Sequence, residues 1–66
     1  MNISVNGEIR EIPKDSTALD LLSLLDMQNA KVAMEINMEI VPRSQHSEFR
    51  LSDGDKVEIV RAIGGG

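Results

Sequence analysis

The chain has 66 residues, no cysteine and a formal net charge of −4. This length allows one domain with a modest core, and the lack of cysteine excludes disulfides, thiolate-bound metals and sulfur carried on a side-chain thiol. The acidic balance, with a single Phe and no Tyr or Trp, argues against nucleic-acid binding, because phosphates would be repelled and no aromatic platform exists for bases.

The first element is predicted to be a β-hairpin. Ile3 and Val5 alternate with polar residues, which is the period of a half-buried strand. Asn6-Gly7 follows and favours a two-residue type I′ turn, because both central positions of that turn need a positive φ. Residues 8–12 are predicted to form the returning strand.

The period then changes to that of a short helix, predicted over residues 18–26. Thr17 is a plausible N-cap, and Asp20 completes a capping-box pair with it that satisfies free N–H groups. Four apolar residues recur at helical spacing and define one face. They are Ala18, Leu21, Leu22 and Leu25.

Three strands are predicted in the second half, at residues 32–36, 39–41 and 57–60. The polar segment 43–50 is predicted to be irregular, with Phe49 as the apolar residue that packs against the core. This order, a strand pair, one helix and then further strands, predicts an α+β fold in which a mixed sheet packs on one helix. Several small α+β sheets share that order; the β-grasp arrangement would insert the last strand beside the first.

The last three residues, 64–66, are three of the five glycines in the chain. We predict one domain over residues 1–62 and a flexible tail at residues 63–66, because glycine disfavours any fixed structure and removes side-chain bulk. Four residues span at most ~13–14 Å, enough to thread the carboxylate of Gly66 into a narrow site. A frayed end without function is the other explanation.

A carboxylate is a poor electrophile until it is converted to a mixed anhydride such as an acyl-adenylate. That conversion needs ATP, and the sequence has no Gly-rich phosphate loop with Lys. We therefore expect the ATP to be bound elsewhere, and we expect this chain to bind no cofactor and not to be an independent enzyme.

Five stretches of the chain carry a family resemblance. They are residues 3–7, 17–22, 40–44 (Ile-Val-Pro-Arg-Ser), 51–60 and 64–66. Together they resemble the ThiS family, the ubiquitin-like sulfur carriers of thiazole (thiamine) biosynthesis, over essentially the whole chain. One departure is Met38, where the family usually has the Gly of a second Asn-Gly turn, so the resemblance does not decide the type of this turn.

The resemblance implies a β-grasp fold and a mechanism centred on Gly66. A ThiF-like adenylyltransferase would adenylate the Gly66 carboxylate with ATP and magnesium, and a persulfide donor would convert it to a thiocarboxylate. The thiazole synthase ThiG would then accept the sulfur. Contacts with these partners are expected from Val60, Ile63, Gly64 and Gly65.

Val60 is expected on the sheet face opposite Val57 and Ile59, because side chains alternate along a strand. An apolar residue there could be a docking contact, and equally an ordinary exposed apolar residue.

His46, the single histidine, is predicted to be a surface loop residue without a catalytic or metal-binding role. Residues 53–55 (Asp-Gly-Asp) are predicted to form a turn, because the other ligands of a calcium loop are missing.

Three other functions stay open at this point. The small subunit of molybdopterin synthase uses the same thiocarboxylate chemistry, although it usually has a longer chain with Phe and Pro before its last glycines. A ubiquitin-like modifier would join Gly66 to lysines, and a passive β-grasp interaction module would not need the tail.

No apolar stretch approaches the ~20 residues of a membrane span, so a cytoplasmic protein without membrane contact is expected.

Overall fold

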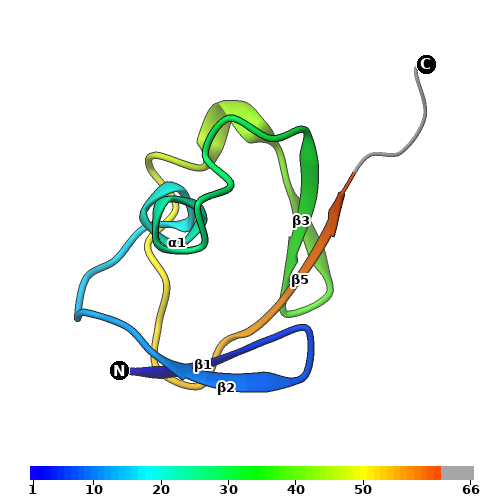
Figure 1. The fold of residues 1–66 in the computed structure, drawn as a ribbon. Helices are drawn as coiled ribbons and strands as arrows, with labels where there is room; N and C mark the ends of the chain where they lie inside the picture. The colour runs from blue at the N-terminus through cyan, green and yellow to red at the C-terminus, as the bar shows by residue number, and fades with distance from the viewer. Residues whose placement is uncertain (62–66) are drawn as a thin grey trace.

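The computed structural model describes residues 1–61. They form a five-stranded sheet with α1 packed against one of its faces (Figure 1). The elements in order are β1 (Asn2–Val5), β2 (Glu8–Glu11), α1 (Ala18–Leu24), β3 (Val32–Ile36), β4 (Glu39–Val41), the 3-10 turn η1 (Arg43–Gln45) and β5 (Lys56–Arg61). The predicted α+β fold with a mixed sheet on one helix is confirmed.

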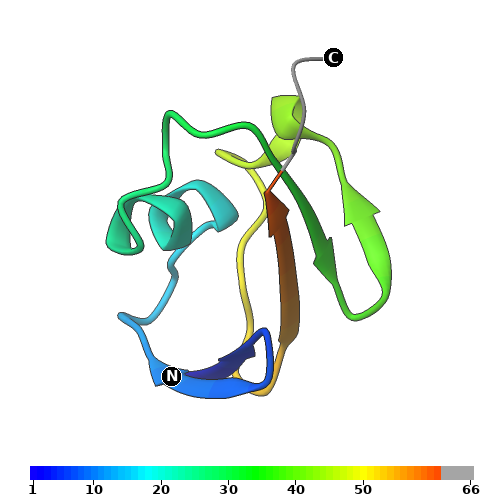
Figure 2. The same cartoon turned by 45° about the vertical axis from the view of Figure 1, so that its right-hand side comes forward.

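The sheet order is β2-β1-β5-β3-β4. The last strand, β5, lies between the two hairpins (Figure 2), parallel to β1 and antiparallel to β3. The insertion of the last strand beside the first is therefore confirmed. β2 ends at Glu11, one residue before the predicted end, although Ile12 and Met1 still exchange two backbone hydrogen bonds of 2.9 and 2.8 Å.

The core lies between α1 and the sheet. It is built from alternate strand residues and from the apolar face of the helix, as the two sequence periods predict. Its buried members are Ile3, Val5, Ile12, Ala18, Leu21, Leu22, Met34, Ile36, Val41, Leu51, Val57 and Ile59. Phe49 is half-buried and packs against this cluster, as expected for an apolar residue within a polar segment.

The two ends of α1 are set by different signals. At the start, the Asp20 amide donates to Thr17 Oγ1 at 3.1 Å and the Thr17 amide donates to Asp20 Oδ2 at 2.9 Å. The predicted capping box is therefore confirmed. The helix ends at Leu24, not at residue 26, because Asp26 adopts a left-handed φ of 59°. The Met27 amide then bonds the Leu22 carbonyl at 2.7 Å, which is a Schellman closure with aspartate in the usual place of glycine.

The turn between β3 and β4 has the same form as the turn at Asn6-Gly7. Asn37 and Met38 have φ values of 54° and 71°, which is the double positive φ of a type I′ hairpin. Met38 therefore adopts a backbone conformation that is most often taken by glycine. Its side chain is 85% exposed, so no packing compensates for the strain of its left-handed backbone.

Replacement of Met38 by glycine is expected to stabilise the fold. A left-handed residue with a Cβ costs about 1–2 kcal/mol, and the greater freedom of glycine in the unfolded chain removes about 0.4–1 kcal/mol of that gain. A net increase of roughly 0.5–1 kcal/mol in the free energy of unfolding should appear in urea titrations. Met38→Ala is the control, since it keeps the Cβ and should gain little; equal stabilities for the two variants would contradict a backbone origin.

Candidate functional site

The candidate site begins at the carboxyl end of β5, the strand that leads to Gly66. β5 is the central strand of the sheet. It pairs with β3 from Val57 opposite Ile36 to Arg61 opposite Val32. Hydrogen bonds along this whole length fix the position of β5. They therefore also fix the direction in which the chain leaves the sheet at Arg61.

On its other side β5 continues past the end of its partner. β1 pairs with it only through Ser4 and Val5, and the Asn6 side chain then extends the ladder. The Ile59 amide donates to Asn6 Oδ1 at 2.8 Å, and Asn6 Nδ2 donates to the Ile59 carbonyl at 3.2 Å. The carboxamide thus takes the place of a backbone peptide group, and it ties the first turn of the chain to the last strand.

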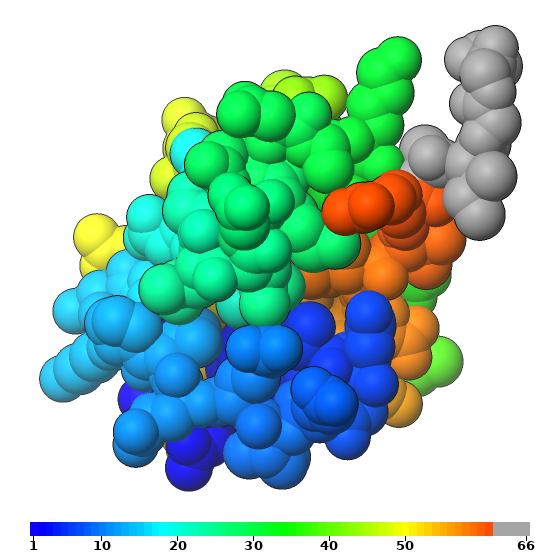
Figure 3. Space-filling view, in the orientation of Figure 1, coloured from blue at the N-terminus to red at the C-terminus, as the bar shows by residue number. Residues whose placement is uncertain are grey.

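Asn6 is visible in the sequence, but its place before Gly7 is already explained by the hairpin turn, so its contact with β5 is not predicted. Asn6-Gly7 predicts a type I′ turn, and the observed φ values of 50° and 87° agree with that prediction. The further function of the Asn6 side chain depends on β5 lying beside β1, which no local pattern specifies. A space-filling view shows β5 (orange to red) reaching the surface between the first hairpin (blue) and the segment that follows α1 (green) (Figure 3).

Val60 lies on the sheet face away from α1, as predicted, and its side chain is 63% exposed. It is opposite Ala33 of β3. Ile40 of β4 and Ile9 of β2 also have exposed side chains, at 72% and 74%. The orientation of Val60 is confirmed, and its use as a docking contact stays a prediction.

The same sheet face also carries negative charge. Glu58 of β5 is directly opposite Glu35 of β3, and like charges in cross-strand pairs destabilise a sheet. A partner cation placed beside Glu35 and Glu58 would relieve this repulsion.

Comparison with known proteins identifies the family. The family model described as "ThiS family" matches residues 3–66. The chain belongs to the ThiS family. It is 35% identical to the Sulfur carrier protein ThiS of Escherichia coli, with all of both chains covered. It also matches the crystal structure of the thiamine biosynthesis protein ThiS of Geobacter metallireducens with a TM-score of 0.86 and 33% identity over the whole of both chains. The β-grasp fold is therefore established.

A second kind of relative is much longer. The Thiazole synthase of Paramagnetospirillum magneticum is 46% identical over 66 residues, which are all of this chain and 20% of that protein. The chain thus spans about a fifth of the length of this relative. In that protein a ThiS-like segment is part of the same polypeptide as a much larger remainder.

Four of the predicted site residues lie outside the part of this ThiS-family chain that the structure describes. They are Ile63, Gly64, Gly65 and Gly66. The predicted boundary between the domain and its tail also falls there. The described part ends at Arg61, so the structure places the strand that leads to these residues.

The prediction of a surface position for His46 is wrong. His46 is 3% exposed, and its Nε2 atom lies 3.0 Å from the Val41 carbonyl oxygen. A carbonyl oxygen only accepts hydrogen bonds, so Nε2 carries the hydrogen. That bond satisfies the polar atom and allows the ring to be buried under η1.

Within residues 1–61, no group of three or more His, Cys, Asp or Glu side chains is placed to hold a metal ion. Residues 53–55 form the turn that the sequence predicts, in which Asp55 Oδ2 accepts from the Ser52 amide at 2.7 Å. In the same part of the chain, no helix is long and apolar enough to cross a membrane.

Proposed function

We propose that this ThiS-family protein carries sulfur as a thiocarboxylate on Gly66 and delivers it for thiazole formation in thiamine biosynthesis. The observation that carries the proposal is the placement of β5. It is the central strand, it is bonded on both sides, and its last residue, Arg61, stands five positions before Gly66 in a chain without cysteine. With no thiol available, a carboxyl group has to hold the sulfur, and we assign this role to the terminal one because the glycines before it carry no side chains.

Activation is assigned to a ThiF-like adenylyltransferase. The Gly66 carboxylate attacks the α-phosphorus of ATP, held with magnesium by that enzyme, and pyrophosphate leaves. The terminal sulfur of a persulfide then attacks the acyl carbon and displaces AMP. Cleavage of the resulting acyl disulfide by a thiol leaves the thiocarboxylate. In this scheme the carrier binds no nucleotide and supplies no catalytic side chain, so it is a substrate and not an enzyme.

The sulfur acceptor is assigned to a thiazole synthase of the ThiG type. The support is the relative named thiazole synthase, in which a segment 46% identical to this chain is joined to a larger remainder. Two activities placed on one polypeptide act at a high effective concentration. Family membership also favours this acceptor over molybdopterin synthase.

Intact-mass measurement tests the proposal. The protein is incubated with a ThiF-type adenylyltransferase, ATP, magnesium and a persulfide donor. It should gain the mass difference between oxygen and sulfur, and fragmentation should map this change to Gly66. A protein amidated at the terminal carboxyl is the control and should gain nothing. Sulfur mapped to an internal residue, or full reaction of the amidated protein, would rule the mechanism out.

A further inference from the structure

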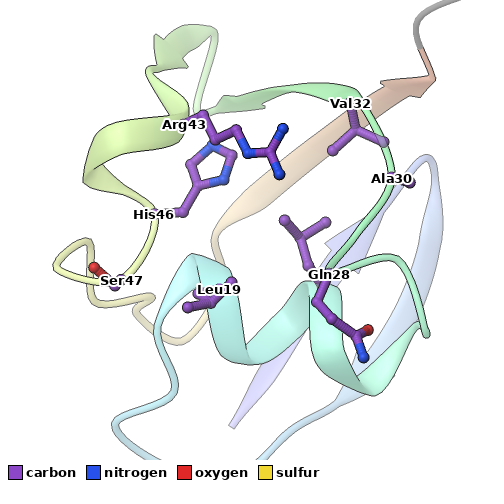
Figure 4. A pocket seen from close by; sticks show the side chains of 8 residues that line it. Leu19, Gln28, Ala30, Val32, Arg43, His46 and Ser47 are labelled. Carbon is purple, nitrogen blue, oxygen red and sulfur yellow. The ribbon is translucent and has the colours of Figure 1, made fainter.

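A small cavity of about 170 Å³ lies between α1, the loop that follows it and η1 (Figure 4). One wall is apolar, formed by Leu19, Leu22 and Val32, and the other contains Arg43 and His46. The cavity belongs to the same end of the domain as the last residue of β5, because Val32 pairs with Arg61 across the sheet.

Arg43 and His46 supply the polar groups that face this cavity. Figure 4 shows the Arg43 guanidinium extended over it toward Val32, with the His46 ring beside it. Because Nε2 of the ring is bonded to the Val41 carbonyl, Nδ1 is the nitrogen on the cavity side. The Ser47 hydroxyl and the Gln28 amide also belong to lining residues, but in Figure 4 both point away.

Arg43 has no carboxylate partner among residues 1–61, where the single salt bridge joins Arg10 to Glu8. Within the described residues the same holds for every basic residue except Arg10, so what distinguishes Arg43 is its place on the cavity wall. Two further basic residues are near Val32, since Lys31 precedes it in the chain and Arg61 is its partner across the sheet. The end of the domain that leads to Gly66 is therefore the part that would attract a negatively charged surface.

The size of the cavity restricts its occupant. The cavity volume of about 170 Å³ is below the roughly 300–1,000 Å³ of sites that enclose nucleotides and other drug-sized ligands. A single carboxylate on a short methylene stem fits, with its oxygens on the guanidinium fork and its stem against Leu19, Leu22 and Val32.

We propose that this cavity receives an aspartate or glutamate side chain of the thiazole synthase that accepts the sulfur. The inference rests on the proposed function and adds a contact at some distance from Gly66. The acidic side chain would pair with Arg43 as the two proteins dock, and this contact would orient the carrier so that its last residues enter the synthase.

The test measures the affinity of the full-length carrier for a purified thiazole synthase by biolayer interferometry. Arg43→Gln should weaken binding by about ten-fold, since docking excludes water from the pair. Arg50→Gln is the matched control, with the same charge change on an exposed arginine outside the cavity, and it should bind like the wild-type protein. Arg43→Lys should fall between the two, because lysine keeps the charge and lacks the planar fork.

Substitution of the synthase identifies the carboxylate. Each Asp and Glu of the synthase is changed singly to Asn or Gln. One such variant should bind the wild-type carrier more weakly and lose nothing further with Arg43→Gln, which is the signature of a direct pair in a double-mutant cycle. Failure of every synthase variant to show this coupling would refute the inference.

Two other binding results separate a failure of this inference from a failure of the proposed function. If the wild-type carrier binds the synthase and Arg43→Gln binds equally well, this inference is wrong and the proposed function stands. If the wild-type carrier does not bind or load the synthase, the proposed function fails, and this inference fails with it.

Inorganic phosphate is the probe for a free anion site. Saturable shifts of the Arg43 and His46 NMR signals at low millimolar phosphate would overturn the proposal in favour of such a site.

Discussion

Deletion of Gly65 and Gly66 is expected to abolish thiocarboxylate formation and to leave the folded domain intact. The loss should be complete, because the deletion removes the carboxyl group that the proposed mechanism adenylates and shortens the segment that presents it. The fold should survive, because the buried core runs from Ile3 to Ile59. Mass spectrometry of the reaction mixture would measure the loss, and the midpoint of thermal unfolding would report on the fold.

Gly66→Ala is the companion variant, since it keeps the chain length and the terminal carboxyl. A Cβ at this position should slow loading in a channel that glycine passes without hindrance, and it should not change the melting temperature. A truncated protein that still supported thiazole formation would show that sulfur travels on another group. A truncation that unfolded the domain would show that the last residues contribute to stability.

Truncation of Leu22 to alanine is expected to lower the free energy of unfolding by about 2–5 kcal/mol. Leu22 is 3% exposed on the α1 face that packs against the sheet, so the change removes buried methyl groups and leaves a cavity. A domain of this size has roughly 3–10 kcal/mol of stability in total. The variant should therefore be largely or partly unfolded at room temperature.

Leu24→Ala is the matched control, because the same atoms are removed from the same helix at a side chain that is 58% exposed. Its effect should stay within about 0.5 kcal/mol. Urea titrations followed by circular dichroism suit both variants, since the chain has no tryptophan to report by fluorescence. Equal effects at Leu22 and Leu24 would contradict the assigned core face of α1.

Much of the secondary structure and one part of the candidate site follow from local patterns. Alternation along β1, β3 and β5 predicts which side chains are buried, and the outward position of Val60 follows from the same rule. The capping box at Thr17 predicts the start of α1 because both of its hydrogen bonds are made within one turn of chain.

Errors arise where the residue type at a position gives no signal of the conformation or burial that it adopts. The left-handed φ of Asp26 ends the helix early, and no glycine marks the position. The polar neighbours of His46 in sequence predict an exposed loop, but the Val41 carbonyl accepts its ring hydrogen and allows burial. The turn type at Met38 was left undecided by the sequence, and the pairing of β3 with β4 gives the turn its type I′ form.

By itself, the sequence determined the element types, the inward-facing residues and the glycine-rich end, because each depends on neighbours within a few positions. Only the tertiary structure decided that β5 lies between β1 and β3, that the Asn6 carboxamide extends the ladder to Ile59, and that Arg43 and His46 face one cavity. These features join segments far apart in the chain. Their geometry follows from satisfying buried hydrogen bonds and packing one core, which are properties of the whole fold.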